Sequence, residues 1–172
     1  MTMQGLNYYT KDEIDEKHWV LAGRVQQNST TSVSVTLPQA DPWGIRVNAS
    51  AETTSDTWGD LRAKDANGNN IGYDRSYIEN ANGTINGYGY SGSNEVPFAV
   101  LPMKTDRNAI CTATSVRSST GNWRGFVFSS HSAAAIDWQG GSTQRDLTAI
   151  KQIELRTGQT GNLYLEVWVL YR

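Results

Sequence analysis

The sequence predicts an all-β fold, an antiparallel β-sandwich of jelly-roll type preceded by a short N-terminal helix. Its 172 residues include 16 glycines, six tryptophans and eight tyrosines but only four prolines, a composition that suits many short strands joined by turns. Several segments alternate apolar and polar residues with the two-residue period of a strand, and Gly- and Asn-rich connections separate them. A β-barrel is the alternative architecture.

The clearest strand is LYLEVWVLY at 163–171. Alternation assigns one face to the core, with Leu163, Leu165, Val167 and Val169. The other face, formed by residues 164, 166, 168 and 170, is too apolar for open solvent, so it is expected to face a second layer or a neighbouring chain. The preceding segment TAIKQIELR is predicted to be the hairpin partner of this strand, joined to it through the turn-rich TGQTGN at 157–162.

Four further segments have strand character, at 32–37, 44–50, 109–117 and 123–130. SSTGN at 118–122 is predicted to link the last two as a second hairpin. Between residues 51 and 96 the sequence becomes polar, rich in glycine and studded with tyrosine. We expect loops on a β-scaffold there, where binding residues tend to collect.

A short helix is predicted near the start of the chain, in NYYTKDEIDEK at 7–17. Thr10 and Glu13 have the spacing of a capping box, in which each side chain bonds to the backbone amide of the other residue. Ile14, His18 and Leu21 would share one stripe, and Gly23 would end the helix. So short a helix is marginal alone, which suggests a neck at 1–23 that assembles with other copies, before a head at 24–172.

Composition and charge exclude several function classes. The net charge of -2 provides no basic surface for nucleic acid and no polybasic patch for a membrane, so neither partner is expected. No apolar run approaches the length of a membrane-spanning helix. The single cysteine, Cys111, has small and apolar neighbours, which predicts a buried strand residue and rules out an intrachain disulfide.

Two motif matches are better explained as turns or loops. GYGYSG at 87–92 fits the dinucleotide-binding pattern G-x-G-x-x-G, but Pro97 follows where a helix would have to run. DANGN at 65–69 resembles the start of a calcium-binding loop, but Asn70 stands where that loop needs glycine. We interpret the first as a loop and the second as a hairpin turn.

No constellation of catalytic or metal-binding residues is recognisable. His18 and His131 lie far apart in the sequence, and no HExxH or CxxC spacing joins them to further ligands. There is no G-x-S-x-G nucleophile elbow. The sequence therefore predicts a protein that is not an enzyme and that uses no cofactor and no metal.

Aromatic residues within polar segments point to saccharide binding. Trp43, Trp58, Trp123 and Trp138 each lie within two residues of a glycine, mostly with a hydrogen-bonding side chain nearby. Flat aromatic faces pack on the C–H faces of sugar rings, while carboxylate, amide and guanidinium groups bind the hydroxyls. Packing in the core or between subunits is the alternative for each single tryptophan.

The segment YYTKDEIDEK resembles the Y-T-K-x-E-[IV]-D segment of bacteriophage tail fibres, baseplate proteins and receptor-binding proteins, where it precedes a β-rich head. The strand with Ile150, Ile153 and Leu155, the polar turn and the aromatic final strand are also similar to such heads. The resemblance implies a homotrimer on the virion, joined to other virion proteins through its N-terminus, with a head that binds a bacterial cell-surface polysaccharide. A structural virion module without its own ligand is the alternative.

If the head binds a saccharide, its site is expected among the aromatic residues of the polar segments. Strand residues are committed to the core, and the neck is committed to assembly. The predicted ligand-binding residues are Trp58, Tyr88, Tyr90 and Trp138 as stacking aromatics, with Asp60 and Asp137 as partners of sugar hydroxyls.

Overall fold

A computed structural model describes residues 18–40, 42–55, 57–81, 84–90, 99–103, 107–117, 123–131, 138–144 and 149–171. Within these ranges the chain is all-β, its strands pair antiparallel and it has no helix, so the antiparallel all-β part of the predicted fold class is confirmed. A search of the same ranges for a helix able to span a membrane found none.

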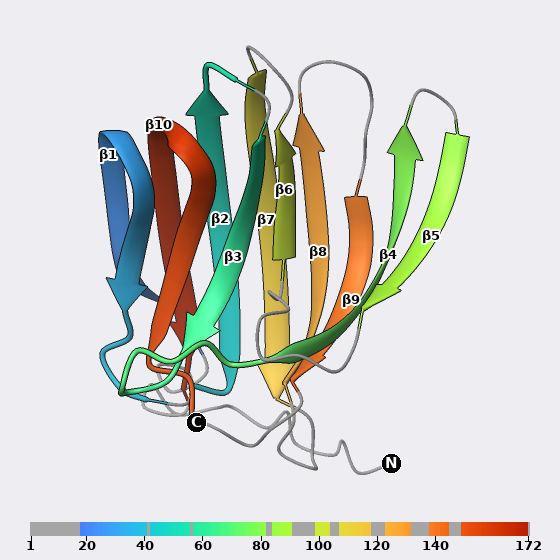
Figure 1. Ribbon diagram of the computed structural model, residues 1–172. Helices are drawn as coiled ribbons and strands as arrows, with labels where there is room; N and C mark the ends of the chain where they lie inside the picture. The colour runs from blue at the N-terminus through green and yellow to red at the C-terminus, as the bar shows by residue number, and fades with distance from the viewer. Residues whose placement is uncertain are drawn as a thin grey trace, which may run out of the picture.

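Ten strands are described (Figure 1). In chain order they are β1 Val20–Thr36, β2 Gly44–Thr53, β3 Thr57–Lys64, β4 Tyr73–Ala81, β5 Thr84–Tyr90, β6 Ala99–Met103, β7 Arg107–Arg117, β8 Trp123–His131, β9 Trp138–Gln144 and β10 Gln152–Leu170.

The longest strands, β1 and β10, form one bent two-stranded ribbon. They pair on both sides of the bend, from Val20 opposite Val169 to Thr36 opposite Gln152, with shifts in register between Leu21 and Gly23 and on either side of Thr30. Ser29 has a positive φ of 55° at this bend. The two halves of β1 pack closely, because a Cβ atom added at Gly23 would lie 2.8 Å from Cγ1 of Val35.

The bend divides the remaining strands into two groups. Residues 161–170 of β10 pair with β2, which is followed by β7, β8, β9, β4 and β5. Residues 152–157 of β10 pair with β3, which is followed by β6. Although β6 is not paired with β7 or β8, it lies against both, so the sheet folds over on itself (Figure 1).

One hydrophobic core lies between these two groups of strands. Side chains from both groups belong to a single buried cluster, and its largest fully buried members are Leu37, Val47, Leu61, Ile150, Ile153, Leu155, Leu163 and Leu165. The predicted core face of the last strand is confirmed, because Leu163, Leu165, Val167 and Val169 are all buried. Alternation predicted these positions well because side chains in a strand point alternately to opposite faces.

The prediction of a helix as far as Gly23 is wrong, because β1 begins at Val20. Leu21 lies opposite Trp168 and Gly23 opposite Val167, so these residues satisfy their backbone groups in a ladder with β10. The earlier part of the predicted helix, with the capping residues Thr10 and Glu13 and with Ile14, lies outside the described residues.

The predicted hairpin at TGQTGN is also wrong. Residues 157–162 belong to β10, and the segments on either side of them pair with β1 instead of with each other. The predicted loop region at 51–96 also contains three strands, β3, β4 and β5. GYGYSG is partly strand, because its first four residues end β5. By contrast, the pairing of β7 with β8 confirms the two strands predicted on either side of SSTGN.

The segment DANGN forms a turn, as predicted. The Asp65 carboxylate accepts hydrogen bonds from the backbone amides of Asn67 and Asn69, each at 2.8 Å, and these bonds hold the pKa of Asp65 below its usual value. Gly68 has a φ of 82°, which favours glycine. The described residues contain no cluster of His, Cys, Asp and Glu that could hold a metal ion.

Cys111 in β7 is buried, as predicted. It belongs to the hydrophobic core, and burial raises the pKa of its thiol to about 12. The thiol therefore remains protonated at neutral pH and serves as a core side chain.

The bend of β10 predicts different effects for two glycine substitutions. A Cβ atom at Gly161 would collide with the backbone carbonyl oxygen of Glu52, whereas one at Gly158 would meet the rotatable hydroxyl of Thr57, at 2.6 Å. We expect Gly161→Ala to lower the free energy of unfolding by about 1–3 kcal/mol. Gly158→Ala should cost less than about 1 kcal/mol. Urea unfolding measures both, and equal losses would contradict the close packing at Gly161.

Candidate functional site

The two ends of the domain differ in character. Both ends of the bent ribbon, where β1 and β10 begin and end, lie together (Figure 1). The bends of β1 and β10 and the connection from β2 to β3 lie at the opposite end (Figure 1). We use the name distal end for the part of this opposite end that is formed by residues 28–31, 53–55, 57–58 and 158–161.

The distal end is rich in short polar side chains. Its exposed residues include Asn28, Ser29, Thr31, Thr54, Ser55, Gln159 and Thr160. Three threonine hydroxyls donate hydrogen bonds to nearby backbone carbonyls and so order the bends. Thr157 donates to Gln159 at 2.7 Å, Thr53 to Ser55 at 3.0 Å and Thr30 to Ser32 at 3.1 Å. This end therefore offers ordered backbone with many hydroxyl and amide groups.

Trp58 is the large apolar side chain of this end. It lies near the start of β3, opposite Pro102 of β6 and next to the bend of β10, and it is 55% exposed. Since Gly59 and Leu61 are buried, alternation along β3 directs Trp58 and Asp60 to the outer face. An indole in this position adds an apolar platform to a polar surface.

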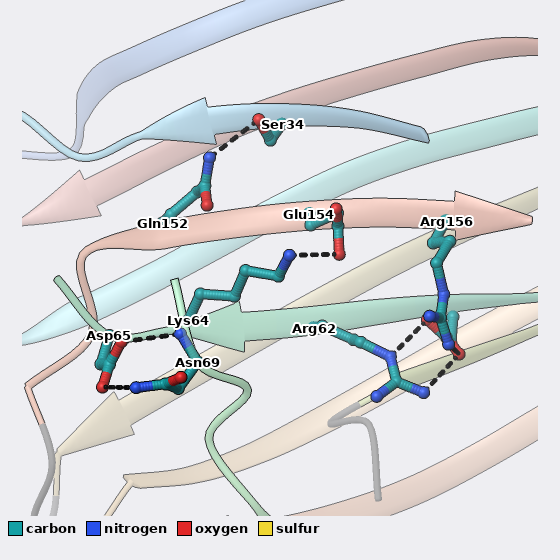
Figure 2. Close-up of polar contacts among 9 residues, drawn as sticks. Ser34, Arg62, Lys64, Asp65, Asn69, Gln152, Glu154 and Arg156 are labelled. Atoms are coloured by element: carbon teal, nitrogen blue, oxygen red, sulfur yellow. Dashed lines mark hydrogen bonds and ion pairs between the residues drawn. The ribbon is translucent and has the colours of Figure 1, made fainter. Parts of the chain in front are cut away.

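Two arginines, Arg62 and Arg156, donate hydrogen bonds to the carboxylate of Asp60. Figure 2 shows how the two arginines lie. Arg62 donates from Nε and a terminal nitrogen to the two carboxylate oxygens, at 2.9 Å each, in a bidentate pair. Arg156, opposite Asp60 on β10, donates to Oδ2 at 3.3 Å. Arg62 is buried, whereas 48% of the Arg156 side chain is exposed. The cluster therefore presents one guanidinium group to solvent.

The same outer face continues away from the distal end as a row of polar pairs. Lys64 and Glu154 form an ion pair at 3.0 Å, and Gln152 donates to the Ser34 hydroxyl at 2.9 Å (Figure 2). These pairs join β3, β10 and β1. They satisfy one another and so contribute to the sheet surface more than to a binding site.

Of the five predicted site residues that the structure describes, Trp58 and Asp60 lie two positions apart on one face of β3. Tyr88 and Tyr90 belong to β5, where their register partners are Tyr77 and Arg75 of β4. Trp138 begins β9, opposite Glu79 and Ser129. These strands lie at the other end of the strand order from β3. Asp137 lies outside the described residues.

Sequence reasoning missed Arg156 and the bend around Gln159. Arg156 lies in a segment that alternation assigned correctly to a strand, but its cross-strand partner Asp60 could not be known from sequence. The turn-rich composition of TGQTGN was the available signal for the bend. It was interpreted as a hairpin connection, so its residues were not considered for binding.

A second polar cluster lies on the outer face of the other strand group, around Glu166 of β10. The residue is only 7% exposed, and both carboxylate oxygens accept hydrogen bonds. The donors are the indole of Trp168 at 2.9 Å, the amide of Asn48 at 3.0 Å, the hydroxyl of Tyr164 at 3.0 Å and Nε of Arg24 at 2.8 Å. A terminal nitrogen of Arg24 also pairs with Oε2.

These donors stabilise the ionised form of Glu166. The hydrogen bond from Trp168, followed by those from Asn48 and Arg24, lowers the pKa of its carboxyl to about 2. The face that was predicted to need a cover is therefore partly covered by its own side chains. A buried carboxylate with a shifted pKa is also common at functional sites, but here every donor belongs to the chain and joins β1, β2 and β10. We interpret the cluster as structural.

The described part of the chain is thus an antiparallel all-β domain with a polar distal end that bears an exposed tryptophan beside a carboxylate and two arginines. No model of a known protein family matches this chain, and a search of curated proteins found no match.

Proposed function

We propose that the chain is the head of a bacteriophage receptor-binding protein and that its distal end binds a saccharide of the bacterial cell surface. The observation that carries the proposal is the exposure of Trp58 on the same strand face as Asp60, within an end rich in hydroxyl and amide groups. Aromatic platforms beside charged and polar hydrogen-bonding groups suit saccharide rings. The virion assignment rests on the resemblance of YYTKDEIDEK to tail-fibre stems.

We also propose that the folded sheet is a β-sandwich of jelly-roll type, in which eight strands form two four-stranded layers. The strand pairing supports this assignment. Because β1 and β10 are bent, each layer contains one half of β1 and one half of β10. One layer has the order β1 (first half), β10 (second half), β2 and β7. The other has β1 (second half), β10 (first half), β3 and β6. The remaining strands extend the first layer.

The position of the site supports attachment at the other end. Both ends of the β1–β10 ribbon lie opposite the distal end, so a head attached through its N-terminal residues would turn Trp58 outwards. The resemblance also implies a homotrimer and contacts of the N-terminus with other virion proteins. Sedimentation of the intact chain tests the trimer, since a monomer at micromolar concentration would contradict it.

Replacing Trp58 by alanine should weaken saccharide binding by about 1–3 kcal/mol, the range of a hot-spot side chain. The fold should be largely unaffected, because more than half of the side chain is exposed to water. Binding is measured on an array of bacterial surface polysaccharides, and stability by thermal melting.

Two further variants serve as controls for Trp58. Trp58→Phe keeps an aromatic face and should retain part of the affinity. Ile85→Ala removes an apolar side chain that is 71% exposed on β5, and it should bind like the wild type. Unchanged binding by Trp58→Ala would exclude Trp58 as the stacking residue and direct attention to Tyr88 and Trp138. A folded protein that binds no polysaccharide would favour a structural virion module.

A further inference from the structure

The described residues on the outer face of β3 and β10, next to Trp58, carry an excess of positive charge, although the whole chain has a net charge of -2. Among the described charged residues on this face of β3 and β10, three are cationic and two are anionic: Arg62, Lys64 and Arg156 against Asp60 and Glu154. Lys64 and Glu154 pair with each other. The excess therefore lies in the cluster of Asp60 with two arginines.

Arg156 is the member of this cluster that can reach a ligand. Asp60 is its only hydrogen-bond partner within the described ranges, through one terminal nitrogen at 3.3 Å. A guanidinium group has five N–H donors, so donors remain for a ligand, and 48% of the side chain is exposed. Arg156 lies directly across from Asp60, hence diagonally across from Trp58, a separation that long side chains span.

The bidentate pair of Arg62 with Asp60 fixes the carboxylate that holds Arg156. Arg156 is therefore oriented before a ligand arrives, which reduces the entropy lost on binding. A planar guanidinium fork matches the oxygen pair of a carboxylate or phosphate far better than it matches a neutral hydroxyl.

We propose that the saccharide recognised at the distal end is anionic, with its ring stacked on Trp58 and its carboxylate or phosphate group paired with Arg156. This inference rests on the proposed saccharide-binding function and adds the charge class of the ligand. Asp60 and Arg62 position Arg156, and Asp60 is not the main partner of the sugar hydroxyls.

The test uses an array of surface polysaccharides from a panel of bacteria, each printed in native, carboxyl-reduced and dephosphorylated form. The chain should bind native acidic polysaccharides at least about tenfold more tightly than the form that lacks the anionic group. The treatment that abolishes binding identifies the group as carboxylate or phosphate. Binding should also weaken with rising salt concentration, because the pair is partly exposed.

Two arginine variants separate the site from general charge effects. Arg156→Gln should bind native and neutralised forms equally weakly, whereas Arg46→Gln, with the same change in net charge, should keep the preference. Arg46 is an exposed residue of β2, where it lies over the ring of Trp19. Thermal melting verifies that both variants are folded.

The outcomes of this test distinguish a failure of the anionic-ligand inference from a failure of the proposed saccharide binding. Equal binding of native and neutralised forms by the wild type would overturn the anionic ligand and leave saccharide binding in place. An unchanged preference in Arg156→Gln would overturn the role of this residue. If no polysaccharide of the panel binds, the proposed function fails and the inference fails with it.

Discussion

Replacing Leu165 by alanine is expected to lower the free energy of unfolding by about 3–5 kcal/mol, the largest effect that we predict for a single substitution. Leu165 is completely buried in β10, where it lies between Val25 of β1 and Ala49 of β2. Alanine would remove buried methyl groups and leave a cavity between the two strand groups, which β-strands pinned by backbone pairing on both sides cannot collapse to fill. The measurement is equilibrium unfolding in urea, followed by tryptophan fluorescence.

The matched control is the same substitution at Leu21, which is 40% exposed on the outer face of β1. Leu21→Ala removes equal volume but opens no internal cavity, so it should cost about 1 kcal/mol or less. A loss at Leu165 no larger than that at Leu21 would mean that the two strand groups do not enclose a packed core there.

Replacing Glu166 by glutamine should be the most damaging change on the outer surface, with an expected loss of about 1.5–3 kcal/mol. Glutamine has the same length, but it removes the negative charge and places an amide donor among groups that all donate to this carboxylate. Trp168, Asn48 and Arg24 would then compete for one acceptor oxygen. Glu52→Gln, at an exposed carboxylate on β2, should change stability by less than about 0.5 kcal/mol.

The same residue makes stability depend on pH in a defined direction. The pKa of Glu166 is lowered to about 2 in the folded protein, against 4.5 for the ordinary side chain. The folded state therefore binds this proton less readily than the unfolded state. Its stabilising contribution is complete above pH 4.5 and is lost as the pH falls from 4.5 towards 2.

Melting temperatures of the wild type and Glu166→Gln, measured from neutral pH down to pH 2, test the linkage. The gap between the two proteins should be widest near neutral pH and should close towards pH 2. A gap that stays constant would show that the carboxylate charge does not contribute and that the variant is destabilised by altered packing.

Alternation determined the strands and their inward faces from the sequence alone. Leu163, Leu165, Val167 and Val169 could be assigned to the core without any knowledge of their partners, because a strand between water and a core must place every second side chain inside. The turn at Asp65 could also be predicted from the sequence, because its hydrogen bonds join residues at most four positions apart. The burial of Cys111 followed from its neighbours.

The sequence alone did not determine which strands pair with each other. TGQTGN has the composition of a hairpin turn, and only the length of β1, which pairs with β10 on both sides of the bend, makes it a continuous strand. Leu21 likewise fits a helix locally and Gly23 its end, but both gain backbone partners in β10. Pairing of segments more than a hundred residues apart depends on the whole sheet, so tertiary contacts overrode local preference.

The candidate site was also determined partly by the sequence and partly by the tertiary structure. The sequence alone indicated that Trp58 and Asp60 are suited to a saccharide, because the chemistry of an indole and a carboxylate belongs to the residues themselves. Only the tertiary structure placed Trp58 at the end opposite the ends of the β1–β10 ribbon, set Arg156 across from Asp60 and assigned Tyr88 to β5, at the other end of the strand order. A binding surface is made of side chains from strands distant in the sequence, and their register decides which of them meet.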